Sequence, residues 1–171
     1  KDNMLIITNE GRKLALDQRL MNEMLEDDPN SKVNTCIKNI YDIWNKTKEN
    51  KSTQLVFCDL STPKQNEELY DENGIYKFTD IYNDIRKKLA EKGIPREQIA
   101  FIHEADTEVR KKELFSRVRN GDVRILIGST SKMGAGTNVQ DRLVALHHLD
   151  CPWRPADLTQ RNGRGIRQGN I

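Results

Sequence analysis

The stretch VRILIGSTSKMGAGTNVQDRLVALHHLD, residues 123–150, holds two apolar runs separated by a glycine-rich connection. The runs extend from Val123 to Gly128 and from Arg142 to Asp150, and both are nearly continuous rather than alternating in apolar character. Strands of that composition are covered on both faces, which is typical of a parallel sheet between two layers of helices. This stretch therefore predicts an α/β domain.

The same alternation of helix and strand extends upstream to residue 31. Apolar residues recur there at helical spacing in three segments, and short runs of strand-forming residues lie between those segments. Together they predict a three-layer α/β domain over residues 31–171, with a mostly parallel sheet between helices. The predicted elements are a helix capped by Ser31 with an apolar stripe through Trp44, a strand at Thr53–Leu60, a helix from Phe78 to Leu89 that ends at Gly93, a strand at Ile99–His103, and a helix capped by Asp106 or Thr107 and ended by Asn120 and Gly121.

Residues 1–30 fit this pattern less well and are predicted to form a lead-in segment. Met4–Thr8 has the composition of an edge strand, and the spacing of four later apolar residues allows a helix; these are Leu16, Leu20, Met21 and Met24. The chain begins at Lys1 rather than at a methionine, so we expect it to be a piece of a longer protein.

Composition and charge exclude several classes of protein. Of the 171 residues, 36% are hydrophobic and 32% charged, and no apolar run approaches the roughly 18 residues that span a bilayer. No secretory signal pattern is visible, so we expect a cytoplasmic protein without a membrane partner. The 28 basic and 26 acidic residues give a net charge of +2, so a site for an anion must be local.

The three cysteines do not have the spacing of a metal site or of a disulfide framework. Cys36, Cys58 and Cys151 are far apart, with no Cys-x-x-Cys pair. Cys58 ends an apolar run, where a free thiol packs as a small hydrophobic side chain. We therefore predict that Cys58 is a core residue and that the chain has no metal site.

The connection after Val123–Gly128 combines glycines with hydroxyl and cationic side chains. Small residues let a backbone approach a ligand closely, hydroxyl groups can bind phosphate oxygens, and a lysine can neutralise them. A loop that needs small residues for packing is an equally good interpretation of the glycines alone. The residues concerned are Ser129, Thr130, Ser131, Lys132, Gly134 and Gly136.

Three arginines recur at a spacing of three in LTQRNGRGIRQGN, Leu158 to Asn170. At helical spacing Arg161, Arg164 and Arg167 would lie near one another and could converge on one anion, because the guanidinium group matches phosphate oxygens bidentately. A solvated basic helix face is the alternative. The glycines among these arginines disfavour it, since each glycine costs a helix about 1 kcal/mol relative to alanine.

Half of a nucleotide-hydrolysing site is absent from the sequence. The chain contains no G-x-x-x-x-G-K-[ST] phosphate loop, and no acidic pair follows an apolar strand in a way that would hold magnesium. We therefore expect that these 171 residues alone do not hydrolyse ATP.

Three blocks resemble the second RecA-like lobe of superfamily 2 helicases and translocases, especially the Swi/Snf-related branch. The match covers roughly residues 31–170, and Asn170 replaces a glutamine in the last block. QLVFCDLS at residues 54–61 looks like motif IV, ILIGSTSKMGAGTNVQ at residues 125–140 is similar to motif V, and LDCPWRPADLTQRNGRGIRQGN at residues 149–170 resembles motif VI with its preceding D-x-x-W-x-P at Asp150, Trp153 and Pro155.

The resemblance implies a role for particular residues. Arg164 and Arg167 would act as arginine fingers on ATP, whose Mg²⁺ is held by the first lobe of the same polypeptide. The nucleotide cleft would be lined by Gly136, Asn138 and Gln160. The surface that binds nucleic acid would include Ser61, His103, Thr130 and Lys132. Ser61 could equally cap a helix, His147 and His148 are expected to be strand residues rather than ligands, and Trp153 is expected to pack rather than to bind DNA.

Two functions of different classes follow from the sequence. The first is the C-terminal motor lobe of a DNA-dependent ATPase, which is either a DNA helicase or a translocase on duplex DNA; the Swi/Snf-like last block favours the translocase. The alternative is a non-catalytic module for nucleic-acid binding or protein interaction that retains the RecA-like fold. The lead-in resembles large phage and mobile-element polypeptides that join such a helicase to a DNA methyltransferase, which would be a further partner domain.

Overall fold

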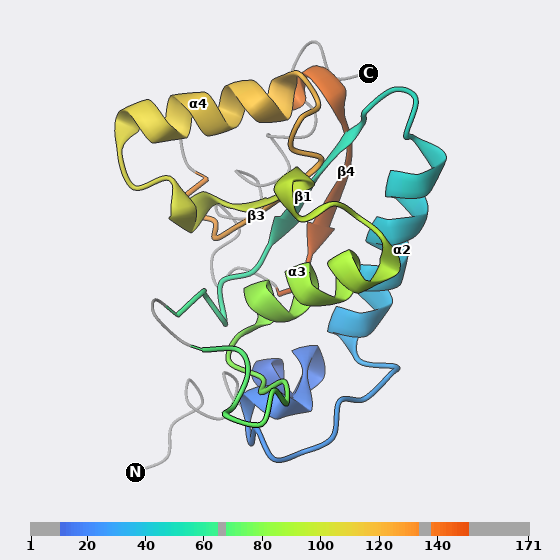
Figure 1. The fold of residues 1–171 in the computed structure, drawn as a ribbon, viewed down its shortest axis with the longest axis vertical. Helices are drawn as coiled ribbons and strands as arrows, with labels where there is room; N and C mark the ends of the chain where they lie inside the picture. The colour runs from blue at the N-terminus through green and yellow to red at the C-terminus, as the bar shows by residue number, and fades with distance from the viewer. Residues whose placement is uncertain (1–10, 65–67, 134–137, 151–171) are drawn as a thin grey trace.

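The computed structural model describes residues 11–64, 68–133 and 138–150, and its strands form one parallel sheet (Figure 1). The strand order is β2-β3-β1-β4, and all three pairings are parallel. The predicted α/β fold with a mostly parallel sheet between helices is confirmed. The elements are η1 (Gln18–Leu20), α2 (Lys32–Lys46), β1 (Thr53–Phe57), α3 (Ile81–Lys92), η2 (Arg96–Gln98), β2 (Ile99–Phe101), η3 (Ile102–Glu104), α4 (Glu108–Arg119), β3 (Ile125–Gly128), η4 (Gln140–Arg142) and β4 (Leu143–His148).

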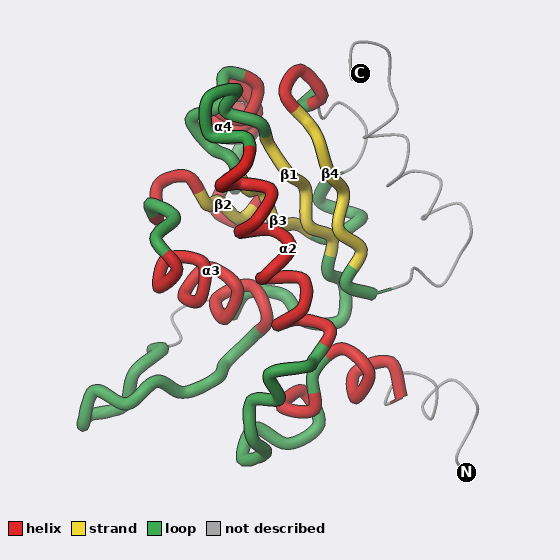
Figure 2. Tube along the Cα trace, turned by 90° about the vertical axis from the view of Figure 1, so that its right-hand side faces the viewer, coloured by secondary structure: helices red, strands yellow, loops and turns green. Residues whose placement is uncertain are grey.

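The helices cover both faces of the sheet, which places a hydrophobic layer on each side (Figures 1 and 2). Val56 and Cys58 point into the layer beneath α2 and α3. Leu55 and Phe57 point into the opposite layer, beneath α4. Because side chains alternate along a strand, a five-residue strand that is buried throughout supplies both layers at once.

The helix caps follow the predictions from sequence. The Ser31 side chain accepts a hydrogen bond from the N–H of Asn34 at 3.0 Å and begins α2. Gly93 ends α3 with a φ of +115°, a conformation that favours glycine. Thr107, rather than Asp106, is the N-cap of α4, since its hydroxyl accepts from the N–H of Arg110.

Three strands end earlier than predicted, and one of them is the strand predicted at Arg142–Asp150, which ends at His148. The strand predicted at Thr53–Leu60 ends at Phe57, because the N–H groups of Asp59 and Leu60 bind the carboxylate of Asp150 instead of a neighbouring strand. The strand predicted at Ile99–His103 likewise ends at Phe101. There the Glu104 carboxylate accepts the Phe101 N–H, which closes the turn of η3.

The lead-in segment packs onto the domain through apolar and charged residues. Residues 11–16 are helical, and Leu16 is buried in the layer beneath α2 and α3. Arg19 is buried against the carboxylates of Asp17 and Asp84. The longer helix that the apolar spacing allowed is not formed, since Met24 is 89% exposed. The predicted edge strand Met4–Thr8 lies outside the described residues.

None of the helices in the described part of the chain is long and apolar enough to cross a bilayer.

Candidate functional site

The carboxyl ends of the four strands meet at one edge of the sheet. Phe57 at the end of β1 is paired with Gly128 of β3 and with His148 of β4, and Phe101 of β2 is paired with Ile127. The polar residues that follow each strand therefore emerge at the same edge, where ligands of such sheets bind. They are Asp59, Ser61, His103, Ser129, Thr130, Lys132 and Asp150.

Thr130 is held at this edge by two hydrogen bonds to one carboxylate. Its N–H donates to Oδ1 of Asp59 at 2.7 Å, and its hydroxyl donates to Oδ2 at 2.8 Å. The side chain of Thr130 is buried, whereas Asp59 is exposed. The pair joins the loops that follow β1 and β3, and it orients the Thr130 hydroxyl.

Asp150, which follows β4, also holds the loop after β1 in place. Its Oδ2 accepts the N–H of Asp59 at 2.8 Å and that of Leu60 at 2.7 Å, and the residue is buried. The sequence singled out Asp150 only as part of a motif. A carboxylate directly after an apolar strand was the signal that could have identified it as a support of this edge.

Ser61 binds the first turn of α3. Its hydroxyl oxygen accepts the N–H of Ile81 at 3.0 Å, beside the N-cap Asp80. This hydrogen bond supports the interpretation of Ser61 as a residue that caps a helix. Nearby, the hydroxyl of Tyr82 donates to the carbonyl of Cys58 at 2.7 Å.

Cys58 is a core residue, as predicted. It is fully buried in the layer beneath α2 and α3. Burial raises the pKa of its thiol well above the usual range, so the thiol stays protonated at neutral pH.

His103 and Lys132 are electrostatically coupled at this edge. The His103 ring meets the ring of Tyr82 edge-on, with centroids 5.3 Å apart. Burial, with a smaller contribution from the charge of Lys132, lowers the pKa of His103, so the imidazole is neutral at pH 7. Its Nδ1 is buried and makes no hydrogen bond within the described ranges, and Lys132 is exposed.

Asn138 stands apart from the other predicted site residues that the structure describes. It is exposed, and its carbonyl accepts a hydrogen bond from Arg119 at the end of α4, at 2.8 Å. The remaining predicted site residues lie outside the described ranges; they are Gly136, Gln160, Arg164 and Arg167.

His147 and His148 are strand residues of β4, as predicted. The Nε2 atom of His147 lies 2.7 Å from Oε1 of Gln54, and burial together with the neighbouring His148 lowers the pKa of His147 to about 4. His148 stacks on Phe57 with ring centroids 5.5 Å apart. Across the described residues, no group of His, Cys, Asp and Glu side chains is arranged to hold a metal ion.

Comparison with known proteins gives a match to a protein family and a short match to a phage protein. The family model described as "Helicase conserved C-terminal domain" matches residues 31–169. The "Defense against restriction protein B" of Escherichia phage P1 is 42% identical over 45 residues, which are 26% of this chain and 2% of that protein. The matched segment thus spans a very small part of the phage protein.

Proposed function

The chain belongs to the family of helicase conserved C-terminal domains, and we propose that it is the second RecA-like lobe of an ATP-driven motor that moves on duplex DNA. The observation that carries the proposal is the match over residues 31–169, which includes all four strands and the arginine-rich end of the chain. The parallel sheet with polar residues gathered at its carboxyl edge agrees with such a lobe.

In this proposal the lobe completes a nucleotide site that another lobe begins. ATP and Mg²⁺ are held by an N-terminal RecA-like lobe of the same polypeptide, and Arg164 and Arg167 contact the transferring phosphoryl group. A guanidinium group is suited to that role because it is always charged and binds phosphate oxygens bidentately. The residues assigned to the nucleotide cleft are Gly136, Asn138 and Gln160.

The carboxyl edge is the proposed contact with the DNA backbone. Thr130 and Ser61 supply hydroxyl groups, Lys132 supplies an exposed positive charge, and His103 is a neutral imidazole. Contacts of this kind fix the position of a protein on DNA without reading the base sequence. The Ser61 hydroxyl can donate to a phosphate oxygen, because its oxygen only accepts a hydrogen bond from Ile81. The Thr130 hydroxyl donates its one proton to Asp59, so in this proposal it exchanges that bond for one to a phosphate oxygen when DNA binds.

We further propose that the chain is part of a large phage or mobile-element polypeptide that acts in the cytoplasm and joins the motor to a DNA methyltransferase domain. The similarity to a protein of phage P1 supports a phage or mobile-element origin.

The test is the DNA-stimulated ATPase activity of the full-length polypeptide. Arg164→Ala and Arg167→Ala should each lower turnover by about 10³-fold or more. The lysine variants at these positions should fail as well, because lysine lacks the bidentate fork. Arg110→Ala is the matched control, since Arg110 is an exposed arginine of α4 whose ion pair with Asp106 is solvent-screened.

Near-normal turnover of both alanine variants would contradict the proposed role of the arginines. A full-length protein with no ATPase activity, and no phosphate loop upstream of residue 1, would instead favour a non-catalytic module that retains the fold.

A further inference from the structure

A hollow of about 680 Å³ opens at the amino-terminal edge of the sheet, opposite the carboxyl edge described above. Its walls come from the end of α2 and the turn after it, from the turn before β2, and from the turn between α4 and β3. The residues that matter for its chemistry are Trp44, Lys48, Lys51, Arg117, Asp122 and Arg124.

Arg124 is a buried cation without an anionic partner. It is 3% exposed, and its guanidinium group donates to the carbonyls of Ser52 and Trp44 and to the hydroxyl of Thr47. All three acceptors are neutral, and Nη1 makes no hydrogen bond in the part of the chain that the structure describes. Burial accordingly lowers the pKa of Arg124, although arginine stays charged at neutral pH.

The other buried arginine of the chain that the structure describes is compensated in the usual way. Arg19 pairs with the carboxylate of Asp17 at 2.7 Å and with that of Asp84 at 2.9 Å. Buried charges are costly unless they are paired. The fold therefore supplies carboxylates to Arg19 and leaves the charge of Arg124 to be neutralised from outside.

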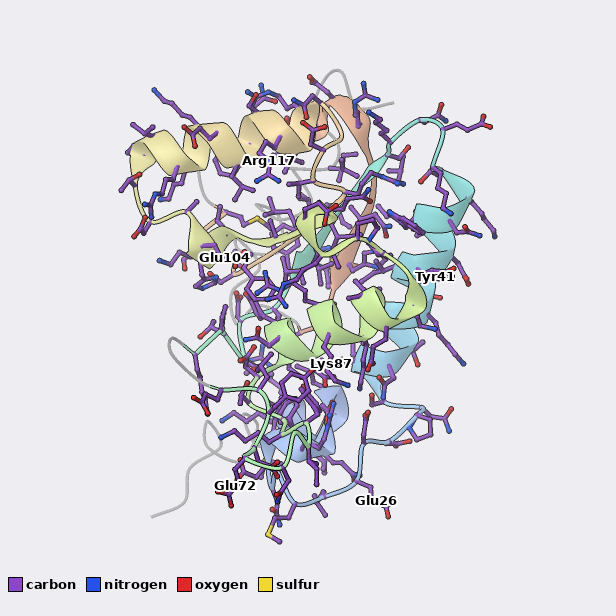
Figure 3. The ribbon with its side chains drawn as sticks, viewed as in Figure 1. Glu26, Tyr41, Glu72, Lys87, Glu104 and Arg117 are labelled. Carbon is purple, nitrogen blue, oxygen red and sulfur yellow. The ribbon has the colours of Figure 1, made fainter. Side chains whose placement is uncertain are left out.

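Three further cations line the same hollow. The Nζ atom of Lys48 lies 4.6 Å from the centre of the Trp44 ring. Arg117 of α4, labelled in Figure 3, makes a hydrogen bond of 3.3 Å to the carbonyl of Glu97. With Lys51 and Arg124 these residues give four positive charges, against the two carboxylates of Glu97 and Asp122. The net charge of the lining is thus +2.

At the rim of the hollow, the turn after α2 packs closely against the turn after α4. Lys51 has a φ of +50°, and Gly121 has a φ of +85°. A Cβ atom added to Gly121 would lie 2.6 Å from Cβ of Lys51. Only glycine fits there, so the two basic turns are held against each other before any ligand binds.

We propose that this hollow binds a phosphate group, either in a small phosphorylated molecule or in a nucleic-acid backbone. A phosphate monoester carries more charge than a carboxylate and has three acceptor oxygens, and the successive phosphodiesters of a nucleic-acid backbone bring several negative charges together. Either can therefore satisfy several cations that come from different segments. The buried Arg124 supplies an N–H at Nη1, while Lys48 and Arg117 supply mobile charges at the rim. The site is separate from the proposed DNA contacts at the carboxyl edge.

The indole N–H of Trp44 is a direct reporter of binding, because it donates to Gln98 at 2.8 Å in the wall of this hollow. Its ¹H–¹⁵N signal would be followed in the 171-residue chain during titration with pyrophosphate, with a short DNA duplex, or with a polyglutamate peptide, at constant ionic strength. A Trp153→Phe variant assigns the signal, since the chain contains two tryptophans.

The test variant is Lys48→Gln with Arg117→Gln, which removes two exposed charges and leaves the buried Arg124 in place. The control is Lys38→Gln with Lys112→Gln, which removes the same charge from exposed positions of α2 and α4 outside the hollow. We expect a saturable shift with pyrophosphate in the wild type and in the control. In the test variant the affinity should fall about tenfold or more, since one hydrogen bond to a charged group contributes that much.

The titrations also identify the source of the phosphate. A response to the DNA duplex that is lost in the test variant assigns the hollow to nucleic acid, and a response to pyrophosphate alone assigns it to a small phosphorylated molecule. Three results would overturn the proposal: no saturable shift with either phosphate ligand, equal responses of the test and control variants, or a response to polyglutamate without one to phosphate.

Discussion

The hydroxyl of Thr130 donates to one oxygen of the Asp59 carboxylate, and the N–H of Thr130 donates to the other oxygen. The two residues are 71 positions apart, and each follows a strand that runs parallel to the other. The N–H of Asp59 is itself held by Asp150. Three loops at the carboxyl edge are thus joined through two carboxylates, which makes this edge a preformed surface.

Removing the Thr130 hydroxyl should therefore destabilise the fold. Thr130→Val removes the donor to one oxygen of the exposed Asp59 carboxylate, which water can then solvate, and we expect a loss of about 0.5–1.5 kcal/mol in the free energy of unfolding. Thr130→Ser keeps the donor and should lose less. Chemical denaturation measures both, with Thr35→Val at an exposed position of α2 as control. Equal stabilities of the valine and serine variants would show that the hydroxyl contributes nothing.

The attachment of the lead-in segment depends on one buried charge network. Arg19 pairs with Asp17 and Asp84, and its guanidinium group lies 4.2 Å from the centre of the Phe78 ring. Arg19→Met should lower the free energy of unfolding by about 3 kcal/mol, because it leaves the buried Asp17 carboxylate without its arginine and Asp84 with Lys88 and Tyr76 alone.

The matched control for this prediction is Arg110→Met, which removes an exposed arginine that pairs with Asp106. We expect a change within about 0.5 kcal/mol there. Denaturant titration of both variants gives the comparison. A loss below about 1 kcal/mol for Arg19→Met would mean that the lead-in contributes little to the stability of the domain.

Local signals in the sequence predicted much of the fold. Ser31, Thr107 and Gly93 act within one helical turn of their partners, so their side chains or backbone preferences suffice to place the helix ends. The end of β1 could not be predicted in this way. It depends on the carboxylate of Asp150, which lies 91 positions from Asp59 and meets it only once the sheet has formed.

The grouping of the candidate site residues could be predicted from the sequence, but the contacts between them could not. Residues that follow parallel strands share an edge, so Ser61, His103 and Thr130 could be grouped from the strand predictions alone. Their partners could not, because the contact of Thr130 with Asp59 depends on the register between β1 and β3. The basic hollow was missed because its cations come from segments that are far apart in the chain.

The half-buried His147 should make stability depend on pH. Its pKa falls from 6.5 to about 4 on folding. Between these pH values the imidazole is protonated in the unfolded chain and neutral in the folded chain. The contribution of His147 to stability is therefore complete above pH 6.5 and is lost as the pH falls towards 4. The slope in this window is at most about 1.4 kcal/mol per pH unit.

The measurement for His147 is the free energy of unfolding between pH 4 and pH 7, for the wild type and His147→Gln. We expect the difference between the two proteins to shrink as the pH falls. The dependence that remains in the variant comes from other groups, including His103, whose pKa is also lowered by burial. A difference that is constant with pH would contradict the lowered pKa of His147.

Substitutions of Ser61 can distinguish a role in helix capping from a role in DNA binding. Its oxygen accepts the N–H of Ile81, so Ser61→Ala should lower the free energy of unfolding by about 1 kcal/mol, whereas Ser61→Thr should retain the bond. The control is Ser116→Ala at an exposed position of α4, where alanine should be neutral or slightly stabilising.

Affinity for a DNA duplex is then measured well below the melting temperature, where every variant is folded. If Ser61 only caps α3, the affinity of Ser61→Ala equals that of the wild type. If its hydroxyl also donates to a phosphate, as we propose, the affinity falls in the alanine variant and is retained with threonine.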